Sequence, residues 1–205
     1  MDVSGHWQNV YSLKAPEEVS WFQEIPSRSA ALIQQFAPAR DARILDVGGG
    51  ASTLADTLLA SGYTALTVLD LAPAALAHAQ ARLAGAAEAV TWLADDILTV
   101  TLPPASVDVW HDRAVFHFLT QPAERAAYLA QVRRVLRPGG YAVIATFAED
   151  GPTRCSGLDV VRYSENALHA VFGEGFVLEC SEREVHTTPS GATQAFTYCV
   201  FGVDT

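Results

Sequence analysis

Residues 44–52 read Ile-Leu-Asp-Val-Gly-Gly-Gly-Ala-Ser, and residues 68–70 further along the chain read Val-Leu-Asp. An apolar segment that runs into consecutive glycines predicts a strand followed by a tight turn, and the second segment predicts a strand that ends in a carboxylate. Glycines let the backbone approach a ligand where any Cβ would clash. Asp70 stands where a carboxylate accepts both hydroxyls of a ribose. The layout therefore predicts a ligand that contains a nucleoside.

The glycine turn also indicates which nucleoside ligand to expect. A nicotinamide fingerprint needs a third glycine where Thr53 stands, and a phosphate-binding loop needs a Lys followed by Ser or Thr, which this turn lacks. Asp46 lies two positions before the first glycine, where its charge favours an ammonium or sulfonium over a phosphate. The sequence favours S-adenosylmethionine over a dinucleotide or a nucleoside triphosphate.

Five motifs in order then resemble those of the class I S-adenosylmethionine-dependent methyltransferases, over approximately residues 40–147. They are the acidic-x-Gly-x-Gly signature, the ribose-binding acid, the adenine-side motif, the fourth strand with its loop, and the turn into the fifth strand, at residues 46–50, 70, 95–97, 107–113 and 136–140. The chain departs from the pattern at Asp95, where many relatives have glycine, and the aligned carboxylate is Asp96. The resemblance implies S-adenosylmethionine as the cofactor and methyl transfer as the reaction.

The periodicity of apolar residues predicts an α/β fold. Short apolar strands alternate with amphipathic helices, which is typical of a parallel sheet covered on both faces. Strands are expected near 43–48, 65–70, 89–94, 106–111 and 141–147, and helices near 27–37, 52–61, 73–84, 122–137 and 167–172. Runs 175–187 and 192–202 flank a turn signal without an intervening helix, so they should pair antiparallel. The resemblance implies the same ending: a doubly wound, mostly parallel seven-stranded sheet of the Rossmann-like methyltransferase type with a C-terminal antiparallel hairpin.

The 205 residues suit a single methyltransferase domain. Within it we expect an aromatic and helical lead-in at 1–40, a cofactor-binding core at 41–147, and a loop, helix and hairpin at 148–205. Residues 1–22 lack clear periodicity, but their large apolar side chains predict an ordered segment. Residues 147–158 have the composition of a loop over an active-site mouth.

Charge and composition exclude several partners. The formal net charge of −10 argues against nucleic acid, because phosphate contacts need clustered Lys and Arg. No apolar run is long enough to span a membrane and no secretory signal is visible, so we expect a cytoplasmic protein. The three cysteines lack the spacing of a zinc site, and no metal is expected. The sequence leaves the oligomeric state open.

The resemblance assigns a set of residues to the cofactor. They are Asp46, Gly48, Gly49, Gly50, Asp70, Leu71, Asp96, Ile97 and His111. The glycine backbone should line the methionine moiety and the ribose, and Leu71 and Ile97 should pack on the adenine. Asp46 is expected to act on the methionine ammonium directly or through water, or only to hold the loop.

The segment that leaves the fourth strand, residues 110–118, places ionisable groups among aromatics. It resembles the methyltransferase-like subgroup that includes lysine methyltransferases of citrate synthase and of elongation factors. His111 and Asp112 are the candidates for positioning or deprotonating the methyl acceptor. The candidates for binding the acceptor are Arg113, His117, Trp7, Tyr11 and Trp21. The alternatives are an Asp112–Arg113 ion pair, a core position for His117, and plain core packing of the aromatics.

The predicted function is S-adenosylmethionine-dependent methyl transfer by SN2 displacement. Such a reaction needs alignment and an unprotonated nucleophile. The acceptor we expect first is a small molecule, and the second candidate is a protein lysine side chain. Two other classes stay open: a catalytically silent S-adenosylmethionine-binding module, because a fold does not assign chemistry, and a nicotinamide-dependent oxidoreductase.

Overall fold

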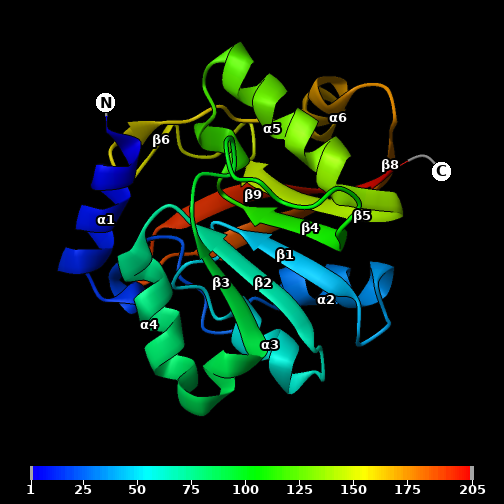
Figure 1. Ribbon diagram of the computed structural model, residues 1–205. Coiled ribbons are helices and arrows are strands. Elements are labelled where there is room, and N and C mark those ends of the chain that lie inside the picture. Colours follow the sequence, from blue (N-terminus) through cyan, green and yellow to red (C-terminus); the bar gives the residue numbers. More distant parts are fainter. Residues whose placement is uncertain (1, 204–205) are drawn as a thin grey trace.

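A seven-stranded sheet forms the centre of the molecule in the computed structural model, which describes residues 2–203. The strand order is β3-β2-β1-β4-β5-β9-β8 (Figure 1). The strands are β1 (Arg43–Val47), β2 (Ala65–Asp70), β3 (Val90–Ala94), β4 (Val107–Arg113), β5 (Leu136–Phe147), β8 (Phe176–Thr187) and β9 (Thr193–Val203). The first five are parallel, and β9 runs antiparallel to β5 and β8. The predicted fold class is confirmed.

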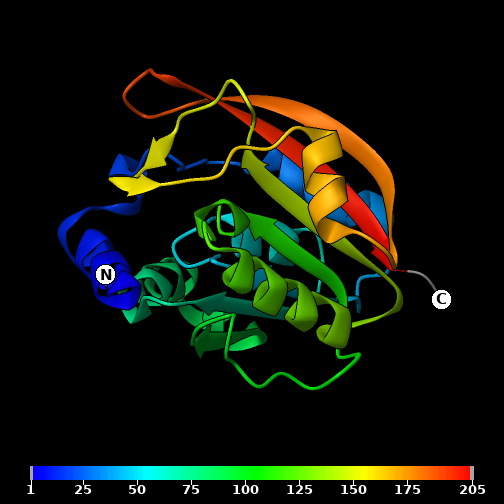
Figure 2. The same ribbon diagram turned by 90° about the horizontal axis from the view of Figure 1, so that it is seen from above.

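Helices cover both faces of this sheet (Figure 2). They are α1 (Val3–Leu13), α2 (Ser27–Phe36), α3 (Leu54–Ala60), α4 (Pro73–Leu83), α5 (Pro122–Val135) and α6 (Glu165–Phe172). Consecutive strand residues point to opposite faces, so Val143 packs in one hydrophobic core and Ile144 in the other. The core with Val143 includes side chains of α2, α3 and α4, and the core with Ile144 includes those of α5 and α6.

The ends of these helices follow signals in the sequence. Pro73 and Pro122 open α4 and α5, where the missing N–H of proline costs no hydrogen bond. The Ser164 side chain caps α6 and accepts a hydrogen bond from the backbone N–H of Ala167 at 3.4 Å. Three 3-10 turns complete the helical segments, η1 (Pro16–Glu18), η2 (Ala84–Ala89) and η3 (Phe116–Phe118). The strands and helices predicted after residue 26 lie where the sequence placed them, with ends that differ by a few residues.

The N-terminal segment is more regular than its sequence indicates. It forms α1, whose first turn is capped by the Asp2 carboxylate accepting from the Gly5 N–H at 2.9 Å. Its apolar side chains at helical spacing, Val3, Trp7, Val10 and Tyr11, span only about two and a half turns, and of them only Tyr11 is buried. The helix packs on α4 through a hydrogen bond from the Ala74 N–H to Gln8 Oε1 (3.1 Å), so the lead-in lies over the carboxyl end of β2.

A second, small sheet follows the main one. Strands β6 (Arg154–Cys155) and β7 (Leu158–Asp159) pair antiparallel within the predicted active-site loop. This hairpin reaches α1, because Ser156 Oγ lies 3.3 Å from His6 Nε2. Among residues 2–203, no helix is long and apolar enough to cross a membrane.

Candidate active site

The carboxyl ends of β1, β2 and β4 meet at one edge of the sheet, and the glycine turn lies there. Gly48 has a φ of +67°, a conformation that side chains disfavour, and its N–H donates to the Leu69 carbonyl at 2.7 Å. A Cβ at Gly49 would collide with the Asp46 carboxylate, and one at Gly50 would collide with the Asp70 carboxylate. The turn therefore needs glycine because two carboxylates of the protein itself press against it.

Asp70 ends β2 beside this turn and is 7% exposed. Its Oδ1 accepts from the Ala72 N–H at 2.8 Å. Burial raises the pKa of this carboxyl to about 7, the hydrogen bond from Ala72 opposes the rise, and the nearby Asp46 charge adds to it. The group lacks a cation to balance its charge, so additional hydrogen-bond donors would stabilise its ionised form.

Three other predicted cofactor residues lie beside Asp70. Leu71 is half-buried, and its carbonyl lies 3.4 Å from Ser4 Oγ of α1. Asp96 Oδ1 accepts from the Leu98 N–H at 2.9 Å, which forms a turn at the end of β3. Ile97 is buried in the core with Leu69. The loops after β2 and β3 are joined by the Asp95 N–H, which donates to the Asp70 carbonyl at 3.1 Å.

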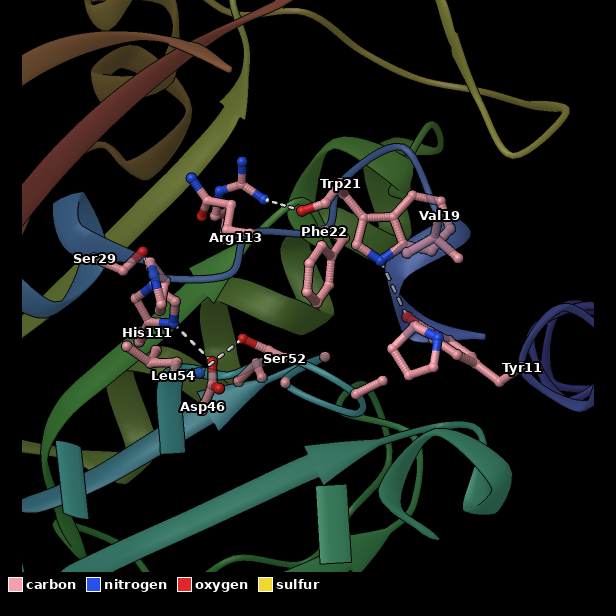
Figure 3. A pocket seen from close by; sticks show the side chains of 17 residues that line it. Tyr11, Val19, Trp21, Phe22, Ser29, Asp46, Ser52, Leu54, His111 and Arg113 are labelled. Atoms are coloured by element: carbon pink, nitrogen blue, oxygen red, sulfur yellow. Dashed lines mark hydrogen bonds and ion pairs between the residues drawn. The ribbon is translucent and has the colours of Figure 1, made fainter. Parts of the chain in front are cut away.

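A buried chain of three side chains crosses from β1 to α2. His111 Nδ1 lies 2.7 Å from Asp46 Oδ1, and His111 Nε2 lies 2.9 Å from Ser29 Oγ (Figure 3). Asp46 and His111 are register partners on β1 and β4, which brings their side chains together. All three residues are at most 5% exposed. Sequence reasoning selected Asp46 and His111 but missed Ser29, since a serine within a helical pattern carries no signal of its own.

Asp112 is turned away from this chain. It is fully buried, and its carboxylate accepts from the backbone N–H of Val115 (2.8 Å) and of Phe116 (3.0 Å) and from the Tyr128 hydroxyl. Burial raises its pKa to about 6, and these hydrogen bonds oppose the rise. Its contacts are those of a group that holds the loop after β4, and it does not line the cavity described below.

Arg113 does not pair with Asp112, so that alternative is wrong. Its guanidinium donates to the Tyr198 hydroxyl (2.9 Å) and to the Trp21 carbonyl (3.0 Å), and it lies 3.5 Å from Glu184. The guanidinium carbon also lies 4.3 Å from the centre of the Phe196 ring. Arg113 thereby ties the N-terminal segment to the hairpin of β8 and β9.

His117 occupies a core position. Its ring lies 4.6 Å from the rings of Phe118 and Phe147, and its Nδ1 accepts from the Phe147 N–H at 3.3 Å. Burial lowers the pKa of His117 to about 3, helped by the Arg113 charge. The ring is therefore neutral, and its Nε2 finds no hydrogen-bond partner among the described residues.

The aromatic candidates pack against one another over the glycine turn. Trp21 donates from Nε1 to the Tyr11 hydroxyl at 3.2 Å, and its ring meets Trp7 edge-on at 5.7 Å. Burial raises the pKa of Tyr11, and the Asp70 charge adds to this. Tyr11 also packs with Ala51. This aromatic cluster closes the edge of the sheet where a nucleoside would enter.

A cavity lies beneath the cluster. It is lined by the glycine turn, by the buried chain, by Arg113, and by aromatic and apolar side chains of the N-terminal segment. The complete lining consists of Tyr11, Pro16, Val19, Trp21, Phe22, Gln23, Pro26, Ser29, Asp46, Val47, Gly48, Gly49, Ala51, Ser52, Leu54, His111 and Arg113. Trp7, His117, Asp112 and the adenine-side residues are not among them. The cavity holds about 50 Å³, far less than the hundreds of Å³ typical of ligand pockets. The cavity as it stands is therefore too small to hold a cofactor and an acceptor together.

The comparisons with known proteins agree with this architecture. The sequence profile of the methyltransferase domain matches residues 44–140. This match covers a little under half of the chain, so the chain is similar to methyltransferases over that segment.

Individual relatives include proteins with different acceptors. An uncharacterized methyltransferase of Mycobacterium tuberculosis is 32% identical over 117 residues, which are 57% of this chain and 56% of that protein. The chain thus spans little more than half the length of that relative. A mouse lysine methyltransferase of elongation factor 1A is 26% identical over 185 residues, 83% of this chain and 71% of that protein. A solved N1-methyltransferase from Burkholderia thailandensis, with bound 1,6-didemethyltoxoflavin and S-adenosylhomocysteine, has a TM-score of 0.70 at 21% identity, covering 98% of this chain and 84% of that one.

Proposed function

We propose that this protein transfers the methyl group of S-adenosylmethionine to a small-molecule acceptor bound in the cavity beneath the aromatic cluster. The observation that carries the proposal is the meeting, in one cavity, of the glycine turn, the Asp46–His111 pair and aromatic side chains. The bound cofactor supplies an electrophilic methyl group on a sulfonium. The protein's part is to align the acceptor and to take up its proton.

The glycine turn and its carboxylates fit the cofactor. The turn at Gly48–Gly49–Gly50 carries no side chains and is packed against Val115, Asp46 and Asp70, so Asp46 contributes a negative charge directly beside it. Asp70 would accept the ribose hydroxyls, and those donors would offset the burial that raises its pKa to about 7. Leu71, Asp96 and Ile97 would hold the adenine side, at the ends of β2 and β3.

A small-molecule acceptor suits the enclosure of this cavity. Tyr11, Trp21 and Phe22 line it, and planar aromatic walls favour a compact apolar or aromatic molecule. The B. thailandensis enzyme, whose structure holds 1,6-didemethyltoxoflavin, shares the fold over nearly the whole chain. Trp7 and His117 support the cluster through their packing, and Arg113 holds the wall that carries Trp21.

A protein lysine is the second candidate acceptor. It is favoured by the mouse relative, whose name assigns it to lysines of elongation factor 1A and whose similarity extends over 83% of this chain. The net charge of −10 would attract a basic protein surface. All three cysteines are free thiols, which suits a reducing compartment such as the cytoplasm for either acceptor.

Turnover with methyl-labelled S-adenosylmethionine tests the proposal. The purified protein is incubated with separate panels of small amines, hydroxyl compounds and thiols, and with lysine-rich peptides, and S-adenosylhomocysteine is quantified. Acceptor-dependent release in a small-molecule panel supports the proposal. Release that occurs only with the peptides favours a protein lysine as the acceptor. Tight cofactor binding without release in any panel indicates a silent binding module.

A further inference from the structure

The His111 ring is occupied at both nitrogens. Nδ1 contacts Asp46 at 2.7 Å and Nε2 contacts Ser29 at 2.9 Å. A ring in this state has no free lone pair to receive a proton from an acceptor. A direct role of His111 as the base would require the acceptor to displace Ser29.

The chemistry of the three side chains fixes which atom donates in each of the two hydrogen bonds. An ionised Asp46 only accepts, so His111 carries its proton on Nδ1 and donates it to the carboxylate. Nε2 is then an acceptor, and the Ser29 hydroxyl must donate to it. Exposure of 5%, 3% and 0% for Asp46, His111 and Ser29 keeps water from competing for these bonds.

Ser29 retains lone pairs on the oxygen that lines the cavity. The neighbouring Tyr198 hydroxyl donates its proton to Glu184 at 3.2 Å and accepts from Arg113 at 2.9 Å, so it does not donate to Ser29. Arg113, the other charged group at this wall, donates to Tyr198 and to Trp21. In Figure 3 the Ser29 and His111 side chains point toward each other at the side of the cavity that carries Asp46. Ser29, His111 and Asp46 all line the cavity, and the Ser29 hydroxyl is the group among them that has both a proton to pass to His111 and a lone pair to receive one.

We infer that Ser29 is a catalytic residue that receives the acceptor's proton while its own proton moves to His111. The inference rests on the proposed function and narrows its substrate class. As the acceptor's nitrogen or oxygen bonds to the methyl carbon, the carbon–sulfur bond breaks and its electron pair stays on sulfur. The acceptor's proton passes to Ser29 Oγ, the Ser29 proton passes to His111 Nε2, and Asp46 stabilises the resulting imidazolium. The substrate is therefore an amine, imide or hydroxyl compound whose nucleophilic atom carries a proton, and not a thioether or tertiary amine.

The direction of the chain is measurable without any acceptor. In ¹⁵N-labelled protein saturated with S-adenosylhomocysteine, NMR of the His111 ring, assigned by its loss in His111→Gln, should show a protonated Nδ1 and a bare Nε2. Ser29→Ala should shift the Nε2 resonance to that of a nitrogen without a hydrogen bond. A protonated Nε2 would overturn the inference, because Ser29 would then accept from His111 and its proton would have no path to the ring.

Kinetics with an acceptor found by the turnover screen tests the proton transfer. Ser29→Ala should lower kcat by about 100-fold or more, with little change in the affinity for S-adenosylhomocysteine. It should also change the pH profile of kcat, and Ser29→Thr should restore part of both the kcat and the profile. The matched control is Ser27→Ala, which alters an exposed hydroxyl in the first turn of the same helix.

Two outcomes would contradict this role. One is a kcat in Ser29→Ala equal to that of Ser27→Ala. The other is a loss of kcat matched by an equal loss of S-adenosylhomocysteine affinity with an unchanged pH profile, which is the signature of a structural role. Methylation confined to tertiary amines or thioethers would also overturn the inference. Absence of any turnover by the unaltered protein is a failure of the proposed function, and the NMR result still decides the direction of the chain.

Discussion

The Asp70 carboxylate fills the space that a side chain at residue 50 would need, so the end of β2 and the glycine turn after β1 are fitted to each other through Asp70 and Gly50. The contact places a buried carboxylate against the buried backbone of the glycine turn. Burial raises the pKa of this carboxyl, two backbone hydrogen bonds lower it, and the Asp46 charge raises it; no cation within residues 2–203 is among the causes of the shift. A ribose with two hydroxyl donors would complete this site.

We predict that Asp70→Asn removes the pH dependence that this carboxyl gives to stability. A folded pKa of about 7, above the usual 3.8, means that the folded protein holds more protons than the unfolded chain between about pH 4 and 7. This contribution to stability is complete below pH 4 and is lost as the pH rises to 7. The difference in melting temperature, Asp70→Asn minus unaltered protein, should therefore grow as the pH rises from 4 to 8, as measured by thermal unfolding. A difference that is constant across this range would contradict the assignment.

We predict that Asp46→Asn weakens S-adenosylhomocysteine binding. The substitution keeps the size of the side chain but removes the charge that faces His111 and the glycine turn. Hydrogen bonds to charged groups contribute roughly 1.5–3 kcal/mol, so calorimetric titration should give a loss of roughly 10- to 150-fold. Asp41→Asn is the control, because this carboxylate is exposed and precedes β1. Equal affinities for the two variants would count against Asp46.

We predict that Gly49→Ala destabilises the protein, whereas Gly85→Ala does not. A Cβ at residue 49 would collide with the Asp46 carboxylate and come within 3.0 Å of Val68, and one at residue 85 would meet nothing within 4 Å. Overpacking of this kind costs about 1–3 kcal/mol. Urea unfolding measures both variants, and equal midpoints would show that the glycine turn tolerates side chains.

We predict that ligand binding moves the N-terminal segment. A cavity of about 50 Å³ under Trp21 leaves no room for the cofactor and an acceptor together, so the aromatic cluster must open. Tryptophan emission should change when S-adenosylhomocysteine binds, and Trp21→Phe should remove most of that change. Trp92→Phe is the control, because Trp92 lies on β3 with its Nε1 bonded to the Ala87 carbonyl. A signal that survives in Trp21→Phe would contradict this movement.

Local patterns were sufficient to predict the central sheet and its helices. These signals depend only on residues that are close together in the sequence. They are the alternating apolar segments, the prolines Pro73 and Pro122 at helix starts, and the turn before β9. Helix α1 was not predicted because it buries only Tyr11 and takes its stability from contacts with α4. The assignment of residues 1–205 to a single domain stays a prediction.

The site was only partly visible in the sequence, because its chemistry depends on contacts between distant residues. Asp46 and His111 carry motif positions and could be selected, but Ser29 joins them from α2, 82 residues before His111. Asp112 stands next to His111 in the sequence, among the same kinds of residue. Its side chain nevertheless faces the opposite side of β4 and accepts a hydrogen bond from the Tyr128 hydroxyl. The helices that cover each face of the sheet decide which of two adjacent strand residues enters the site. The roles given to the site residues stay predictions.

Thermal unfolding with S-adenosylmethionine, S-adenosylhomocysteine, NADH or ATP tests whether this protein binds S-adenosylmethionine as its cofactor. A ligand at a hundred times its dissociation constant adds about 2.7 kcal/mol, which raises the melting temperature of a domain of this size by roughly 5–10 °C. We predict such a rise in melting temperature with the two adenosyl-sulfur ligands and none with NADH or ATP. A rise with NADH alone, or with none of the four ligands, would contradict it.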